Sequence, residues 1–248
     1  MPKIRDVSLS LNMTRIAVTF ALLAESSEFL RRLRGRTGAE RNGVRIVRGK
    51  IHDRMIEVVH TGVGEKVCRQ RVAEFLQDQQ FDLLISAGFA GALNDQLKVG
   101  DLLLAKNFST IELNNRRSSF SSLSIHEADL LTVSALIDSS EKRLEIAQAS
   151  GAAAVDMETE FIAGACAEHG IPLLSLRVIS DTLDEPFPAP SKVLFDIEQQ
   201  RTNLLKLAAF FLAHPNRVPR LIQFARRIAQ GRKFLANALV DVVRSIEV

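Results

Sequence analysis

FDLLISAGFAGAL, residues 81–93, is an apolar run that leads into closely spaced glycines, which is the pattern of a buried strand entering a turn. Two earlier segments follow the same plan. RIAVTFALLA (15–24) breaks at a polar triplet into a helical pattern, and IEVVHTGVG (56–64) ends in a Gly-x-Gly that opens the helical segment 65–79. This alternation predicts an α/β fold with a mainly parallel sheet that is covered by helices on both faces.

The later part of the chain continues the alternation and then changes character. LKVGDLLLA (97–105), LLTVSAL (130–136) and IPLLSLRVIS (171–180) are typical of further strands. Prolines then cluster in EPFPAP, and the segments beyond them predict two helices. For a chain of 248 residues we expect one domain, with a core over about residues 15–184 and a helical extension over about residues 191–248.

The composition excludes several classes of protein. The chain is 46% hydrophobic and 25% charged, with a net charge of +3, which is ordinary for a globular protein. No apolar run reaches the roughly eighteen residues that a membrane-spanning helix requires. Cys68 and Cys166 lack metal or redox spacing, so we expect both to be reduced core side chains in a cytoplasmic protein.

The C-terminal part of the chain is basic. No Asp or Glu occurs between Gln199 and Val240, where the basic residues are Arg201, Lys206, Arg217, Arg220, Arg226, Arg227, Arg232 and Lys233. Because the chain has no Tyr, no Trp and no nucleic-acid-binding motif, we expect no nucleic acid partner. Two alternatives are open for this tail: peripheral contact with an anionic membrane surface, or packing on the core or on a partner subunit with its arginines in solvent.

AVDMETEFIA, residues 154–163, places three carboxylates, Asp156, Glu158 and Glu160, in an otherwise apolar setting. A short apolar segment precedes them and a helical pattern follows. This predicts a strand-to-helix transition, which is a common position for ligand-binding side chains in α/β folds. Asp156 and Glu160 could equally cap or solvate the start of the helix.

Two other carboxylates lie at the ends of apolar strands. Glu25 follows the first strand, and Asp181 ends IPLLSLRVISD. Side chains at such ends line the crevice where ligands of open α/β sheets bind. The Gly-x-Gly at 62–64 could hold an anion at a helix N-terminus, but the dinucleotide fingerprint is incomplete. His126-Glu127 begins like a zinc-protease motif, yet the second histidine is missing, so we predict no metal site and no cofactor.

The chain resembles the purine nucleoside phosphorylase and methylthioadenosine nucleosidase superfamily over most of residues 15–184, through RIAVTFALLAE, LLISAGFAGALNDQLKVGDLLLA and AVDMETEFIAGACAEHGIPLLSLRVISD. These carry a glycine-rich strand end, a Val-Gly-Asp turn, a Met-Glu pair before a helix and a strand that finishes Ile-Ser-Asp. The resemblance implies a three-layer phosphorylase-like fold with a twisted mixed β-sheet flanked by helices. It also implies homo-oligomers and cleavage of a nucleoside N-glycosidic bond.

By this resemblance, Glu158 accepts hydrogen bonds from ribose hydroxyls, Met157 packs against the sugar, and Asp181 acts on N7 of the purine. The chemistry agrees, because cleavage creates oxocarbenium character on the ribose and the base leaves well only when it is protonated. A carboxylic acid can supply that proton, and an ionised glutamate can stabilise the sugar. The pocket for the base or phosphate is completed by Ala87, Gly88, Phe89, Ser180, Val133 and Ser134.

The nucleophile could be water or phosphate. Glu25 aligns with the glutamate that activates water in the nucleosidase branch, whereas the usual phosphate ligands of phosphorylases are replaced by ALLAESS and by Ser86 and Phe89. Arg48 or another arginine could substitute for them. We therefore favour a nucleosidase, and the alternative is a phosphorylase with an atypical phosphate site and phosphate as co-substrate.

A departure from the methylthioadenosine nucleosidases and a resemblance to another branch of the superfamily bear on the substrate. VSALIDSSEK (133–142) replaces the usual base loop, and the tail LAHPNRVPRLIQFAR is similar to that of the hopanoid-associated phosphorylase branch, which is linked to release of adenine from the lipid adenosyl-hopane. We predict cleavage of a purine nucleoside, with adenine favoured, or of a 5′-substituted adenosine. The rival is a nucleoside-binding protein without turnover, although a binder needs neither Glu25 nor Asp181.

Overall fold

The computed structural model describes residues 14–111, 125–137, 139–190, 193, 200 and 204–246. Its strands are β1 (Arg15–Phe20), β2 (Arg34–Arg41), β3 (Val44–Ile51), β4 (Arg54–His60), β5 (Leu83–Ala92), β6 (Leu102–Ala105), β7 (Ile125–Ala128), β8 (Leu130–Thr132), β9 (Ala154–Asp156) and β10 (Leu173–Asp181). They form one ten-stranded sheet in the order β2-β3-β4-β1-β5-β10-β6-β7, and β9 joins β8 to β5 beside this path.

The described helices are α1 (Leu23–Leu30), α2 (Glu65–Leu76), α3 (Ser140–Ser150), α4 (Thr159–His169), α6 (Leu204–Ala213) and α7 (Val218–Ser245), and the 3-10 turn η2 (Pro215–Arg217) joins the last two. Local sequence explains several ends. Gly151 and Gly170 end α3 and α4 at φ angles of 69° and 63°, a left-handed conformation that glycine adopts without steric cost. Ser139 begins α3 by accepting a hydrogen bond from the backbone N–H of Lys142.

The centre of the sheet is parallel, as the alternation of strands and helices predicts. β4, β1, β5 and β10 lie side by side in parallel, with Val18 opposite both Val58 of β4 and Ile85 of β5. β10 pairs with β6 antiparallel, β9 pairs with β5 antiparallel, and the β2-β3-β4 edge is antiparallel. The predicted α/β fold with a mixed sheet between helices is thus confirmed, and the expectation of a mainly parallel sheet holds for its centre.

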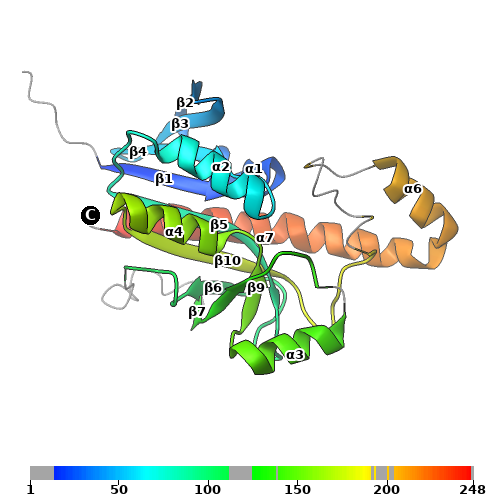
Figure 1. The fold of residues 1–248 in the computed structure, drawn as a ribbon. Coiled ribbons are helices and arrows are strands. Elements are labelled where there is room, and N and C mark those ends of the chain that lie inside the picture. Colours follow the sequence, from blue (N-terminus) through cyan, green and yellow to red (C-terminus); the bar gives the residue numbers. More distant parts are fainter. Residues whose placement is uncertain are drawn as a thin grey trace, which may run out of the picture.

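Helices cover both faces of this sheet (Figure 1). On one face α2 and α4 pack on β1 and β5, in a core that includes Ala17, Phe75 and Ile162. On the other face α1 and α7 pack on the same strands, in a core that includes Val18 and Leu239. Successive strand residues supply opposite cores because side chains alternate across a strand. This explains why the central strands read as continuous apolar runs.

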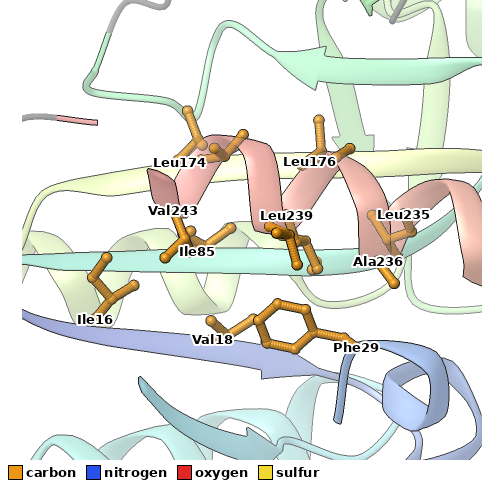
Figure 2. Close-up of a cluster of buried hydrophobic side chains, with 14 of the residues drawn as sticks. Ile16, Val18, Phe29, Ile85, Leu174, Leu176, Leu235, Ala236, Leu239 and Val243 are labelled. Atoms are coloured by element: carbon orange, nitrogen blue, oxygen red, sulfur yellow. The ribbon is translucent and has the colours of Figure 1, made fainter. Parts of the chain in front are cut away.

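The helix α7 joins the core to the C-terminal extension. Leu235, Leu239 and Val243 of its second half pack against Ile85 and Leu174 of the sheet, as Figure 2 shows. Its first half, residues 218–230, is exposed or half-buried and runs past the sheet toward α6 (Figure 1). Packing of the tail on the core, one of the two predicted alternatives, is therefore confirmed for the second half of α7. None of the described helices has the length and apolar run that would let it cross a bilayer.

Two predicted strands are shorter than the sequence indicates. The segment 15–24 leaves the sheet at Phe20, because the backbone then turns into α1. The segment 130–136 leaves the sheet at Thr132, since its partner β9 has only three residues and gives way to α4.

Candidate active site

A cavity of about 500 Å³ opens at the carboxyl ends of β5 and β10, beside the start of α4. This volume lies within the range that is usual for small-molecule sites. Its lining brings together Glu25, Glu158 and Asp181, which are far apart in the sequence. Met157, which directly precedes Glu158 in the chain, also lines the cavity. The strand-end carboxylates predicted from the sequence therefore share one cavity.

Glu25 lies in the first turn of α1, and its side chain points back at the end of β1. Its Oε2 accepts hydrogen bonds from the backbone N–H groups of Ala21 and Leu22, at 3.1 and 3.2 Å. Burial raises the pKa of Glu25 from 4.5 to about 7, because desolvation outweighs these hydrogen bonds and the attraction of the Arg177 guanidinium. A carboxyl with a pKa near neutrality is suited to exchange protons during a reaction.

Glu158 lies immediately before α4 and faces the Gly-x-Gly turn that ends β4. Its Oε1 accepts a hydrogen bond of 3.0 Å from the backbone N–H of Gly64, which has a φ of 86° that favours glycine. The group that this turn holds is thus the chain's own carboxyl group. The neighbouring N–H of Val63 is also occupied, because it donates to Oε1 of Gln200 at 2.7 Å. The pKa of Glu158 is raised mainly by burial and, to a smaller extent, by repulsion from the Asp156 carboxylate.

Asp181 ends β10 at the floor of the cavity, where it forms a buried ion pair with Arg143 of α3. The side chains are 1% and 5% exposed. Arg143 also donates to the backbone oxygens of Ile137 and Ala92, at 3.2 and 3.1 Å, and Ser180 Oγ lies 2.5 Å from Asp181 Oδ1. The carboxylate is therefore held in one position and its charge is compensated.

Asp156 organises the strand-to-helix transition, and it also lines the main cavity. It forms a buried ion pair of 2.9 Å with Arg177 of β10 and accepts hydrogen bonds from Thr132 Oγ1 and from the backbone N–H of Thr159. Glu158 occupies the N-cap position of α4, and Asp156 stabilises the start of the helix by accepting the first backbone N–H. Glu160 is exposed in the first turn of the same helix.

A second cavity of about 10 Å³ adjoins the main one and shares Ala21, Glu25, Phe89 and Glu158 with it. This is close to the least space that one water molecule requires. Polar groups on several sides face this space, since its lining also contains Thr19, Thr61, Ser86 and Arg177. A water molecule here would have the two to four polar partners that buried water needs.

The other predicted pocket residues fall into three groups. Met157, Phe89, Val133 and Ser180 line the main cavity, whereas Ala87 and Gly88 line the small one with Phe89. Ser134 is exposed and lies outside the lining of both. Arg48, considered as a phosphate ligand, instead pairs with Glu57 at 3.2 Å on β4, outside both cavities.

Arg143 and Arg177 are site residues that the sequence reasoning missed. Arg177 had a usable signal, because a charged residue inside a wholly buried strand requires a partner. Arg143 had none, since it lies among the many polar residues of α3. Within the part of the chain that the structure describes, no group of three or more His, Cys, Asp or Glu side chains is arranged to hold a metal ion.

The outer wall of the main cavity is apolar and comes from the C-terminal extension. α6 contributes Leu207 and α7 contributes Leu221, Phe224 and Ile228. Phe187 of the preceding loop also lines the cavity and packs edge-on against Phe224, with ring centroids 5.6 Å apart. The cavity therefore has an acidic inner end and an apolar outer end.

The sequence pattern of the Phosphorylase superfamily matches residues 15–126 and 118–213, which span most of the chain. The chain belongs to this superfamily. It is 23% identical over 222 residues to a 5′-methylthioadenosine/S-adenosylhomocysteine nucleosidase from Buchnera aphidicola, covering 78% of this chain and 88% of that protein. The predicted superfamily is therefore confirmed.

Solved structures of the superfamily share the fold at low sequence identity. Futalosine hydrolase of Helicobacter pylori is 17% identical with a TM-score of 0.71, covering 94% of this chain and 99% of that chain. The 5′-methylthioadenosine/S-adenosylhomocysteine nucleosidase of Campylobacter jejuni is 19% identical with a TM-score of 0.72, covering 94% of this chain and all of that one. The phosphorylase-like fold extends over nearly the whole chain.

Proposed function

We propose that this protein hydrolyses the N-glycosidic bond of a purine nucleoside. The observation that carries the proposal is the water-sized cavity between Glu25 and Glu158, at the edge of a nucleoside-sized cavity that ends at Asp181. The arrangement supplies the three functions that such a reaction needs: a base beside water, an anion beside the sugar, and an acid beside the purine. Relatives named as nucleosidases and a hydrolase support the same reaction class.

In the proposed mechanism, ionised Glu25 takes a proton from the water in the small cavity as the water oxygen attacks C1′ of the ribose. The raised pKa of Glu25 matches this role, because a base with a pKa near 7 is both available and sufficiently basic. The ribose gains positive charge as the bond to the base breaks. Glu158 accepts hydrogen bonds from the ribose hydroxyls and stabilises that charge, and Met157 packs on the sugar.

Asp181 acts at the other end of the bond: its carboxyl group, after uptake of a proton from solvent, donates that proton to N7 and makes the purine a better leaving group. The carboxylate that remains is stabilised by the guanidinium of Arg143 and by Ser180 Oγ. These transfers leave Glu25 protonated and Asp181 ionised, and loss of one proton from Glu25 to solvent with uptake of one proton by Asp181 restores both groups. The reaction consumes the nucleoside and one water molecule, and it forms a free ribose compound and a free base.

Water is favoured over phosphate by space and by charge. The small cavity has about 10 Å³, which is close to the space of one water molecule, so the five heavy atoms of a phosphate ion would extend beyond it. Glu25, which is ionised in the proposed mechanism, borders it and would repel a dianion at short range. The arginine in its lining, Arg177, is already paired with Asp156.

The substrate we propose has adenine as its base and an apolar group at the 5′ position. Adenosine-type compounds are named for the nucleosidase relatives. The apolar outer wall formed by Leu207, Leu221, Phe224 and Ile228 supports a 5′ substituent that is larger than a hydroxyl. The similarity of the tail to the hopanoid-associated branch agrees with such a group. Homo-oligomer formation and a cytoplasmic location stay predictions.

Product analysis tests the proposal. The purified protein is incubated with adenosine, methylthioadenosine or inosine, each with and without inorganic phosphate, and the sugar product is identified. We expect free ribose compound and free base, at a rate that does not depend on phosphate. Sugar 1-phosphate that forms only with phosphate would establish a phosphorylase. Adenine binding with no turnover of any substrate would establish the nucleoside-binding protein.

A further inference from the structure

The helix α6 has an exposed apolar face that nothing in the described structure covers. Leu205, Ala208, Ala209 and Leu212 are exposed, and their spacing of three and four residues places them on one side of the helix. The two leucines are 84% and 83% exposed. The opposite side of α6 faces the rest of the protein, because Leu207 lines the main cavity and Phe211 is buried. A helix that is apolar on both sides ordinarily has an apolar surrounding on both sides.

Basic side chains follow this face directly in the chain. Arg217 and Arg220 at the start of α7 are exposed, and among the described residues neither forms an ion pair. Arg217 is tied to α6 because its guanidinium lies 5.6 Å from the ring centroid of Phe210. Long arginine side chains can reach past neighbouring apolar groups to a polar layer. We call the four residues of the α6 face together with Arg217 and Arg220 the tip surface.

From this surface we propose that the protein docks on anionic lipid bilayers through the tip surface, with the leucines of α6 in the interface and the arginines on lipid phosphates. Charge decides the occupant. The segment 199–240 contains no acidic residue. The tip surfaces of two copies would therefore repel each other, whereas an anionic headgroup layer attracts the tip surface. Exposed leucines beside basic residues are the composition of helices that lie in the membrane interface.

Docking in this way would bring the cavity close to the bilayer. α6 places Leu207 in the cavity wall and Leu205 on the tip surface, and α7 places Leu221 in the wall and Arg220 on the tip surface. The wall of the cavity and the docking surface are therefore opposite sides of the same two helices. An amphiphilic compound could pass from the bilayer to the cavity with little exposure of its apolar part to water.

Vesicle co-sedimentation tests the proposal without reference to turnover, so its outcome is distinct from that of the proposed activity. The full chain is mixed with phosphatidylcholine vesicles that contain or lack phosphatidylglycerol. We expect binding to the anionic vesicles that weakens as salt is raised. The double variant Arg217→Gln/Arg220→Gln should lower the partition coefficient about thirtyfold, and Leu205→Ser/Leu212→Ser should lower it by at least tenfold.

Matched controls separate docking from misfolding and from self-association. Leu144→Ser on α3 removes a leucine that is 48% exposed away from the tip surface, and Arg36→Gln removes an exposed arginine of β2; neither should change vesicle binding. Circular dichroism and light scattering are recorded for every variant. Equal binding to both vesicle types, unchanged binding of both double variants, or a change of oligomer size in the leucine double variant with unchanged vesicle binding would overturn the proposal.

Discussion

Replacement of Glu25 by Gln should abolish most activity and at the same time stabilise the fold. Gln keeps an oxygen that can accept the backbone N–H groups of Ala21 and Leu22, which Glu25 now accepts at 3.1 and 3.2 Å. The local structure should persist for this reason. What disappears is the ionisable group, so the variant isolates the effect of its charge.

The size of both effects follows from the pKa of Glu25. Loss of a general base lowers turnover by about a hundred- to ten-thousandfold. The rise of the pKa from 4.5 to about 7 means that the folded state holds the proton more tightly than the unfolded state. The free energy of unfolding then falls as pH rises between these values, by about 3 kcal/mol at about pH 8 and by about 1 kcal/mol at about pH 5. Gln avoids this loss, so the variant should gain these amounts.

Two assays check the prediction. Adenine release across a pH series should show kcat/KM of the native protein rising through about pH 7, and the residual activity of Glu25→Gln should lack that rise. Urea denaturation near pH 8 and pH 5 should show a stability gain that is larger at the higher pH. Glu160→Gln is the matched control, because Glu160 is exposed in the first turn of α4. If the Glu25→Gln variant keeps the same rise in activity, another group is the base.

Three further predictions concern the neighbouring carboxylates. Asp181→Asn should lower turnover at least about a hundredfold while adenine affinity, measured by calorimetry, changes by less than about tenfold. Gly91→Ala should also lower turnover, because its Cβ would lie 3.0 Å from Asp181 Oδ2, whereas Gly164→Ala in α4 meets no atom within 4 Å and should leave turnover unchanged. Arg177→Met should cost about 3–5 kcal/mol of unfolding free energy in urea, because it leaves the buried carboxylate of Asp156 without its partner.

Each of these predictions has a contrary result. Full turnover of the Asp181 variant would remove this residue from the chemistry. Equal turnover of the two glycine variants would show that the floor of the cavity tolerates displacement of its carboxylate. A loss of less than about 1 kcal/mol on removal of Arg177 would place its partner Asp156 in a more hydrated setting than the 1% exposure of that side chain indicates.

Much of the site was predictable because its residues end apolar strands. Glu25 and Asp181 could be recognised as edge residues from the runs that precede them, and the strand-to-helix position of Glu158 followed from its flanks. Their roles came from resemblance to a superfamily. Their assembly around one cavity depends on strand order, which brings β1, β5 and β10 together although they are far apart in the chain.

The remaining features depend on packing that local patterns do not encode. Arg143 reaches Asp181 from a helix whose sequence is rich in polar residues, and the raised pKa of Glu25 results from burial. The sequence alone determined the α/β class and the carboxylates, because apolar periodicity and strand-end chemistry are local, and its motifs indicated the superfamily by resemblance. Only the tertiary structure decided which arginine compensates which carboxylate and how α6 and α7 close the cavity, because these contacts join residues that are remote in the chain.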